Sequence, residues 1–131
     1  MYNEVLLEHN LHPEFRGQIE KIKPIKLTNS SCGDELVIYL KIQDGKITDG
    51  RFSGTGCAIS QASADLFIKE ILGKSREEAM KKRELFEKML LDKITEKESQ
   101  ALGEIKALEC VSKMPARVKC AKLAWESLEK L

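Results

Sequence analysis

Alternating apolar and polar positions predict a small antiparallel sheet in the first half of the chain. Residues 36–42 are rich in β-branched and aromatic side chains, which is typical of a strand. An Asp-Gly pair at 44–45 is a strong signal for a two-residue hairpin turn, and the returning strand covers about 46–53. Residues 18–27 alternate more loosely around Pro24, which favours an edge strand because proline cannot donate to a ladder.

Helical spacing of apolar residues dominates the rest of the chain. The first dozen residues predict a short helix that ends at Pro13. Small residues fill the first half of a helix predicted over 57–72, and Gly73 stands where a left-handed, helix-ending residue belongs. Residues 74–106 are rich in charge but keep an apolar stripe, so we interpret them as a solvated helical segment.

The C-terminal part of the chain predicts one further helix. Its apolar residues recur at steps of three and four: Val111, Met114, Val118, Ala121, Trp125 and Leu128. Such spacing places one face of a helix on the core, with Pro115 tolerated near the first turn.

The composition is that of one globular domain over residues 1–131. The chain is 42% hydrophobic and 33% charged, with a net charge of +1. This balance gives no electrostatic basis for binding nucleic acid, and no apolar run is long enough to span a membrane. The opening residues lack the basic and apolar regions of a secretory signal. We therefore expect a cytoplasmic protein whose four cysteines stay reduced.

The hairpin register brings two of the cysteines together. If the Asp-Gly pair forms a two-residue turn, Cys32 falls opposite Cys57. The same register places Asp34 opposite Thr55, although a bulge at Gly50 would shift it by one residue. All three candidate ligands are then expected at the open end of one hairpin.

Cys57 also begins the helix predicted over 57–72. The dipole and the free N–H groups of a helix N-terminus favour a thiolate there. Gly54 and Gly56 let the backbone turn sharply and leave the sulfur accessible.

Cys120 lies about 120° from the centre of the C-terminal apolar stripe, where a packing cysteine would be unusual. Arg117 and Lys119 flank it, and nearby cations lower the pKa of a thiol. Together with the hairpin residues, this gives three thiolates and one carboxylate, a tetrahedral set suited to zinc or an iron–sulfur cluster. The carboxylate is the weaker partner for a soft metal and favours a labile site.

Simpler interpretations stay open for each residue. A free cysteine is often a small buried hydrophobe, and Asp34 alone fits a turn residue at the start of a strand. A disulfide between the first two cysteines is geometrically allowed but disfavoured in a reducing compartment. Cys110 sits near the apolar stripe, which favours packing over a site role. His9 and His12 are interpreted as surface or capping residues rather than ligands.

Three motifs resemble the IscU/SufU family of iron–sulfur assembly proteins, which is related to the NifU N-terminal domain. They are Ser-Cys-Gly-Asp at 31–34, Gly-Thr-Gly-Cys-Ala-Ile-Ser-Gln-Ala-Ser at 54–63 and Pro-Ala-Arg-Val-Lys-Cys at 115–120. Residues 12–17 loosely resemble the family's N-terminal motif.

Two further features point to the SufU-like branch. Lys119 stands where IscU-type proteins have histidine, and the charge-rich segment resembles an insertion found in that branch. Cys110 departs from the family, which usually has glycine there.

The resemblance implies an α+β fold, a three-stranded antiparallel sheet packed by about five helices as in SufE/NifU-like proteins. It also implies a metal site of Cys32, Asp34, Cys57 and Cys120, which holds zinc in SufU-like members. In IscU-like members the equivalent site, whose cysteines here are Cys32, Cys57 and Cys120, assembles a [2Fe–2S] cluster.

Two functions follow from the resemblance, and whether the protein is an enzyme depends on which one holds. The first is a scaffold that accepts persulfide sulfur from a pyridoxal-phosphate cysteine desulfurase and passes a labile cluster to apo iron–sulfur acceptor proteins. The second is a zinc-dependent sulfurtransferase that relays sulfur without carrying a cluster. Cys32 is the expected persulfide acceptor and Cys120 the alternative, with Arg117 and Lys119 in supporting roles. A purely structural zinc module that binds a partner is a third reading, which the position of Cys120 and the carboxylate disfavour.

Overall fold

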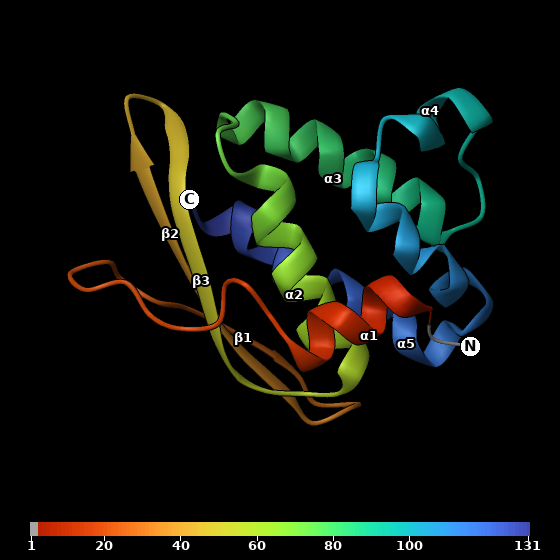
Figure 1. The fold of residues 1–131 in the computed structure, drawn as a ribbon, viewed down its shortest axis with the longest axis horizontal. Helices are drawn as coiled ribbons and strands as arrows, with labels where there is room; N and C mark the ends of the chain where they lie inside the picture. The colour runs from red at the N-terminus through yellow and green to blue at the C-terminus, as the bar shows by residue number, and fades with distance from the viewer. Residues whose placement is uncertain (1–2) are drawn as a thin grey trace.

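The computed structural model describes residues 3–131 and has one sheet with helices packed against it (Figure 1). The strands β1 (Ile25–Asn29), β2 (Asp34–Gln43) and β3 (Lys46–Thr55) form an antiparallel sheet in the order β1-β2-β3. Alternate residues of β2, from Leu36 to Leu40, are buried on the face toward the helices. The predicted edge strand exists, but it begins at Ile25 because Pro24 cannot join the ladder.

Seven helices accompany the sheet in the described residues, two more than the number expected. The α-helices are α1 (Glu4–Leu11), α2 (Ala58–Ile71), α3 (Arg76–Leu90), α4 (Glu96–Gln100) and α5 (Pro115–Lys122), and the 3₁₀ helices are η1 (Gly103–Lys113) and η2 (Ala124–Lys130). The predicted fold class, an α+β fold with a three-stranded antiparallel sheet, is confirmed. The first two residues of the chain, which we expected in the first helix, lie outside the described residues. None of the helices in the described part is long and apolar enough to cross a membrane.

The helix α2 is the centre of the fold and lies between the sheet and the other helices (Figure 1). Small residues in its first half allow close packing, and most of its side chains are buried. It begins at the N-cap Cys57 and is followed by Gly73, whose φ of 83° is the predicted left-handed conformation.

The predicted register of the hairpin is wrong by one residue over most of its length. Asp34 lies opposite Asn29 of β1, whereas Thr55 pairs with Glu35. The shift arises between Lys41 and Ile42, where Thr48 of the partner strand is left without a pair. The extra residue is therefore at Thr48 and not at Gly50.

The spacing predicted one C-terminal helix, and this prediction is wrong. The segment consists of three pieces, η1, α5 and η2. Met114 separates the first two pieces, and Pro115 occupies the first position of α5, where its missing N–H costs no hydrogen bond. The last piece still packs on the core: Trp125 is fully buried, with its ring 4.8 Å from that of Phe67 and 4.9 Å from that of Phe86.

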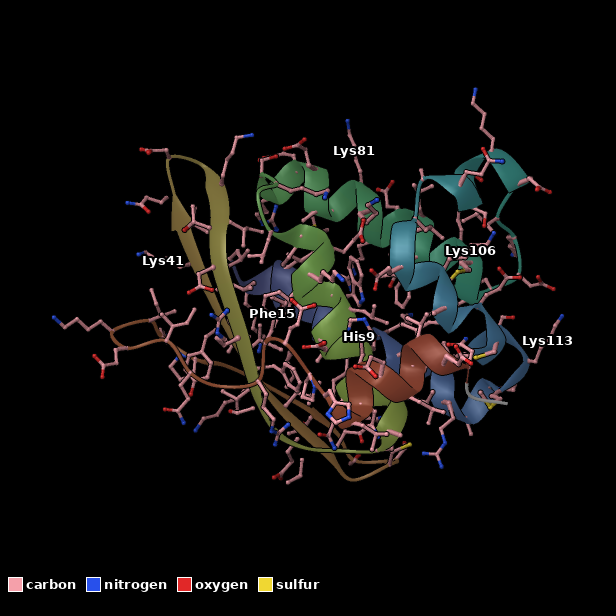
Figure 2. All side chains as sticks on the ribbon, in the orientation of Figure 1. His9, Phe15, Lys41, Lys81, Lys106 and Lys113 are labelled. Carbon is pink, nitrogen blue, oxygen red and sulfur yellow. The ribbon has the colours of Figure 1, made fainter. Side chains whose placement is uncertain are left out.

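The charge-rich segment is helical, as predicted. Helix α3 begins with a capping box, in which Ser75 accepts from the N–H of Glu78 and the Glu78 carboxylate accepts from the N–H of Ser75. Its apolar stripe includes Phe86 and Met89, which are buried. Lys81 of α3, in contrast, projects outward at the periphery of the molecule, as does Lys113 at the end of η1, beyond this segment (Figure 2).

Candidate metal centre

Three of the predicted ligands converge at one end of the sheet. Cys32 lies in the β1–β2 turn, Asp34 is the first residue of β2, and Cys120 comes from α5. One ligand atom of each side chain lies within 4.8 Å of the others. The sulfur atoms of Cys32 and Cys120 are 3.1 Å apart. The structure thus gathers two thiols and a carboxylate from segments that are far apart in the sequence.

Cys57 borders this group without belonging to it in the present conformation. Its sulfur accepts a hydrogen bond from the backbone N–H of Ser60, at 3.4 Å, as the N-cap of α2. Its own backbone N–H donates to Oδ1 of Asp34, at 2.9 Å. Cys57 is half-buried. The helix start that the sequence predicted therefore places a fourth donor residue directly against the carboxylate.

Asp34 is buried with its carboxylate fully engaged. The hydroxyl of Ser60 donates to Oδ1 at 3.2 Å, and the side-chain amide of Asn29 donates to Oδ2 at 3.3 Å. Burial on its own raises the pKa of Asp34, but the hydrogen bonds from Cys57, Cys120, Ser60 and Asn29 lower this pKa below its ordinary value. The side chain is therefore an ionised carboxylate, the form that binds a metal.

Cys120 is fully buried, and its environment contradicts the expectation of a low pKa. Burial raises the pKa of the Cys120 thiol well above its usual range, and the neighbouring Cys32, Asp34 and Cys57 raise it further. The flanking cations do not reverse this shift, and Lys119 is exposed to solvent, which weakens its effect on the buried sulfur. A thiol in such surroundings gives up its proton when a cation provides compensating charge.

Arg117 is a cation in direct contact with the group. Its Nη1 lies 3.6 Å from the sulfur of Cys32. A hydrogen bond with Cys120 and the charges of Cys57 and Cys32 raise the pKa of the Arg117 guanidinium. Arg117 therefore places a permanent positive charge beside the half-buried sulfur of Cys32.

The donor set fits zinc or an iron–sulfur cluster. Thiolates and carboxylates are both zinc ligands, and thiolates hold iron–sulfur clusters. Loss of the thiol protons beside the Asp34 carboxylate would gather negative charge in a buried place, which a bound cation would neutralise. Three candidate ligands lie together, and Cys57 would complete a set of four.

The remaining cysteine and the two histidines lie away from this group. Cys110 is half-buried in η1 and its sulfur faces the carbonyl of Ala107, at 3.7 Å, in agreement with the packing interpretation. His12 is exposed and its backbone N–H caps α1, as expected. The interpretation of His9 as a surface or capping residue is wrong, since its side chain is buried against Asp65.

Sequence reasoning missed two polar residues that touch the group, Asn29 and Ser60. Asn29 stands just before the turn between the first two strands, and its contact with Asp34 follows only from the β1–β2 register. Ser60 follows Cys57 by three residues, the spacing at which the N-cap side chain meets the backbone N–H of a helix. That spacing could have indicated its place next to the site.

These features define a small α+β protein with a group of cysteine and aspartate side chains at one end of its sheet that could hold a metal ion. The chain belongs to the family of the NifU-like N terminal domain, whose model matches residues 1–121. The resemblance stated from the motifs is thereby confirmed.

Relatives with full-length similarity include two curated proteins and a solved structure. The chain is 37% identical to the zinc-dependent sulfurtransferase SufU of Bacillus subtilis, over 99% of this chain and 88% of the relative. It is 40% identical to the iron–sulfur cluster assembly scaffold protein IscU of Thermotoga maritima, over 98% and 90% of the two chains. A crystal structure of a candidate iron–sulfur cluster assembly scaffold for the SUF system of Fervidobacterium islandicum superposes with a TM-score of 0.89. It has 39% identity and covers 98% of this chain and 94% of that one.

Proposed function

We propose that this protein accepts sulfur from a pyridoxal-phosphate cysteine desulfurase and serves as the scaffold for a labile iron–sulfur cluster. The observation that carries the proposal is the 3.1 Å approach of the Cys32 and Cys120 sulfurs beside the ionised Asp34. The names of the IscU and SufU relatives agree with it. We also propose that residues 1–131 form one domain. The apolar core cluster, which includes side chains from both the sheet and the helices of the described part, supports this.

Cys32 is the proposed sulfur acceptor because its sulfur is half-buried on a turn, whereas Cys120 is enclosed. The Cys32 thiolate attacks the terminal sulfur of the desulfurase persulfide. A new sulfur–sulfur bond forms on Cys32 while the bond to the desulfurase cysteine breaks, and that cysteine leaves as a thiolate. Arg117 stabilises the negative charge on the sulfur it faces. The sulfur of Cys120 is 3.1 Å from that of Cys32, which makes Cys120 the alternative acceptor.

The cluster is the cargo of this reaction. Cys32, Cys57 and Cys120 would hold its iron through sulfur, and Asp34 would supply the weaker oxygen ligand that permits release. Lys119, the exposed neighbour of Cys120 in the chain, has a supporting electrostatic role. Apo iron–sulfur proteins would receive the cluster. The thiols demand a reducing compartment, which supports the cytoplasm as the place of action.

A zinc-dependent sulfurtransferase is the second candidate function. It is favoured by the full-length similarity to SufU and by the compact set of two thiols and a carboxylate, which suits a resident zinc ion. Cys32, Asp34, Cys57 and Cys120 would hold the zinc. Bound zinc would keep the thiols deprotonated, and sulfur would pass through Cys32 without cluster assembly.

One experiment separates the two functions. The protein is mixed with a cysteine desulfurase and cysteine, and the persulfide is located by mass spectrometry in the wild type and in the Cys32→Ser and Cys120→Ser variants. The reaction is then repeated anaerobically with ferrous iron, and cluster formation is followed by absorbance. Cys110→Ser is the matched control, because this cysteine lies outside the group.

We expect persulfide on Cys32 and cluster formation in both the wild type and the control. Persulfide without a cluster at any iron concentration would exclude the scaffold and leave the sulfurtransferase. Absence of persulfide from every cysteine would contradict both functions.

A further inference from the structure

Asn29 is a buried polar residue that the proposed chemistry does not use. It is the last residue of β1 and only 7% of its surface is exposed. The β1–β2 register places it directly opposite Asp34. Burying a polar side chain is costly unless it is hydrogen-bonded, so its contacts indicate why it is there.

The side-chain amide of Asn29 meets two site atoms at once. Its Nδ2 lies 3.3 Å from Oδ2 of Asp34 and 3.6 Å from the sulfur of Cys120. An amide nitrogen carries two hydrogens, so both contacts can form together. If the amide were reversed, its carbonyl oxygen would face the Asp34 carboxylate, and two acceptors cannot bond to each other. The amide nitrogen is therefore the atom that faces the site.

Each oxygen of Asp34 is held from a different part of the fold. Oδ1 accepts from the backbone N–H of Cys57 and the hydroxyl of Ser60, both at the start of α2. Oδ2 accepts from Asn29 on β1. The carboxylate is therefore fixed in rotation, with Oδ2 on the side of the Cys120 sulfur that the same amide contacts.

We propose that Asn29 is a positioning residue of the metal centre. It directs Oδ2 of Asp34 toward the incoming metal and donates a hydrogen bond to the sulfur of Cys120. Partners of metal ligands that act in this way orient the ligand and set its affinity for the metal. The inference rests on the proposed function, because it requires that Asp34 and Cys120 bind a metal.

The test replaces Asn29 and measures metal binding directly. Asn29→Leu keeps the approximate size and removes the donor. Asn29→Thr places a strand-favouring residue there, with a hydroxyl that is too short to reach both acceptors. Zinc affinity is measured by competition with a chromogenic chelator, and the ligand geometry by the absorption spectrum of the cobalt(II)-substituted protein. Ser127→Ala is the matched control, since this fully buried hydroxyl donates to the carbonyl of Ala124 within η2.

We expect both Asn29 variants to bind zinc about 10–100-fold more weakly than the wild type. We also expect the cobalt bands of both variants to shift, and the control to change neither property. A residue that only stabilises the strand would lower stability in urea without moving the cobalt bands. Zinc affinities of both variants within twofold of the wild type, with unchanged cobalt spectra, would overturn the inference.

The two proposals fail in different ways. Metal binding is measured without a desulfurase, so a wild type that binds zinc but receives no persulfide contradicts the proposed function and leaves the role of Asn29 standing. A wild type that binds neither zinc nor cobalt overturns the inference together with the metal site.

Discussion

Nδ1 of His9 lies 2.5 Å from Oδ2 of Asp65, in a buried pair that joins α1 to α2. Oδ1 of the same aspartate accepts a hydrogen bond of 2.8 Å from the backbone N–H of Phe15. This bond fixes the chain just after α1. Nε2 of His9 lies 3.1 Å from Oε2 of Glu104, on η1. In Figure 2, His9 lies in the interior among the helices. One histidine thus connects α1, α2 and η1.

This pair predicts a large loss of stability in Asp65→Asn. The substitution keeps the shape of the side chain but removes its charge. It also leaves one acceptor oxygen where two are used, by His9 and by the backbone N–H of Phe15. Breaking a buried pair in this way costs about 3 kcal/mol or more. The free energy of unfolding, from urea denaturation at neutral pH, measures the loss.

Lys113→Ala is the matched control for this prediction. Its ion pair with Asp92 is formed by two exposed side chains, and pairs of that kind contribute little. Equal losses of stability in the two variants would contradict the structural role of the His9–Asp65 pair.

A second prediction concerns Gly54, at the end of β3. It has φ of 105°, and an added Cβ would collide with the backbone carbonyl oxygen of Glu35. Gly73 also has positive φ, at 83°, but open space surrounds the position of its Cβ. Alanine at Gly73 should cost about 1–2 kcal/mol from the backbone conformation alone. Alanine at Gly54 should cost clearly more, because the β2–β3 ladder must also move beside the metal centre.

Urea denaturation of the two alanine variants checks this difference. Zinc affinity is expected to fall in Gly54→Ala and to remain unchanged in Gly73→Ala. Similar stabilities for both variants would show that the ladder yields easily at Glu35.

The sequence was sufficient to predict the sheet, the helix start at Cys57 and the gathering of Cys32 with Asp34. These features depend on local rules, such as turn chemistry and helix termini. The exact register was not predictable: the sequence marks Gly50 as the candidate bulge, whereas the extra residue is Thr48. Packing decides between them: an added Cβ on Gly50 would lie 2.9 Å from Cγ2 of Ile68 on α2. This glycine is needed for close contact with the helix, and the bulge falls elsewhere.

The polar residues around the site were harder to predict for a related reason. Asn29 and His9 look like a turn former and a surface histidine when only their neighbours in the chain are considered. Their partners are 91 residues away for the Asn29 contact with Cys120, and 56 for the pair of His9 with Asp65. Such contacts exist only after the helices have docked on the sheet.

A third prediction concerns the redox chemistry of the metal-free protein. The sulfurs of Cys32 and Cys120 are 3.1 Å apart, and a small approach to about 2.05 Å would bond them. Diamide, which accepts two electrons and two protons, should therefore convert this pair of thiols into a disulfide. Bound zinc should protect the thiols. Mass spectrometry of the digested protein checks the linkage, with Cys110→Ser as a control that should react identically. A disulfide that involves Cys110, or equal oxidation with and without zinc, would contradict the geometry.

The last prediction tests Cys57 as the fourth ligand through metal-linked stability. A ligand that binds only the folded state at 100 times its Kd stabilises that state by about 2.7 kcal/mol. For a chain of this size, zinc at that excess should raise the Tm of the metal-free protein by about 10 °C. Cys57→Ser should lose much of this increase at the same zinc concentration, because a hydroxyl is a poor zinc ligand. Cys110→Ser should retain it in full. Calorimetry of the wild type and of both variants, each with and without zinc, measures the six Tm values. An unchanged increase in Cys57→Ser would restrict the site to Cys32, Asp34 and Cys120, the three residues whose ligand atoms already lie together.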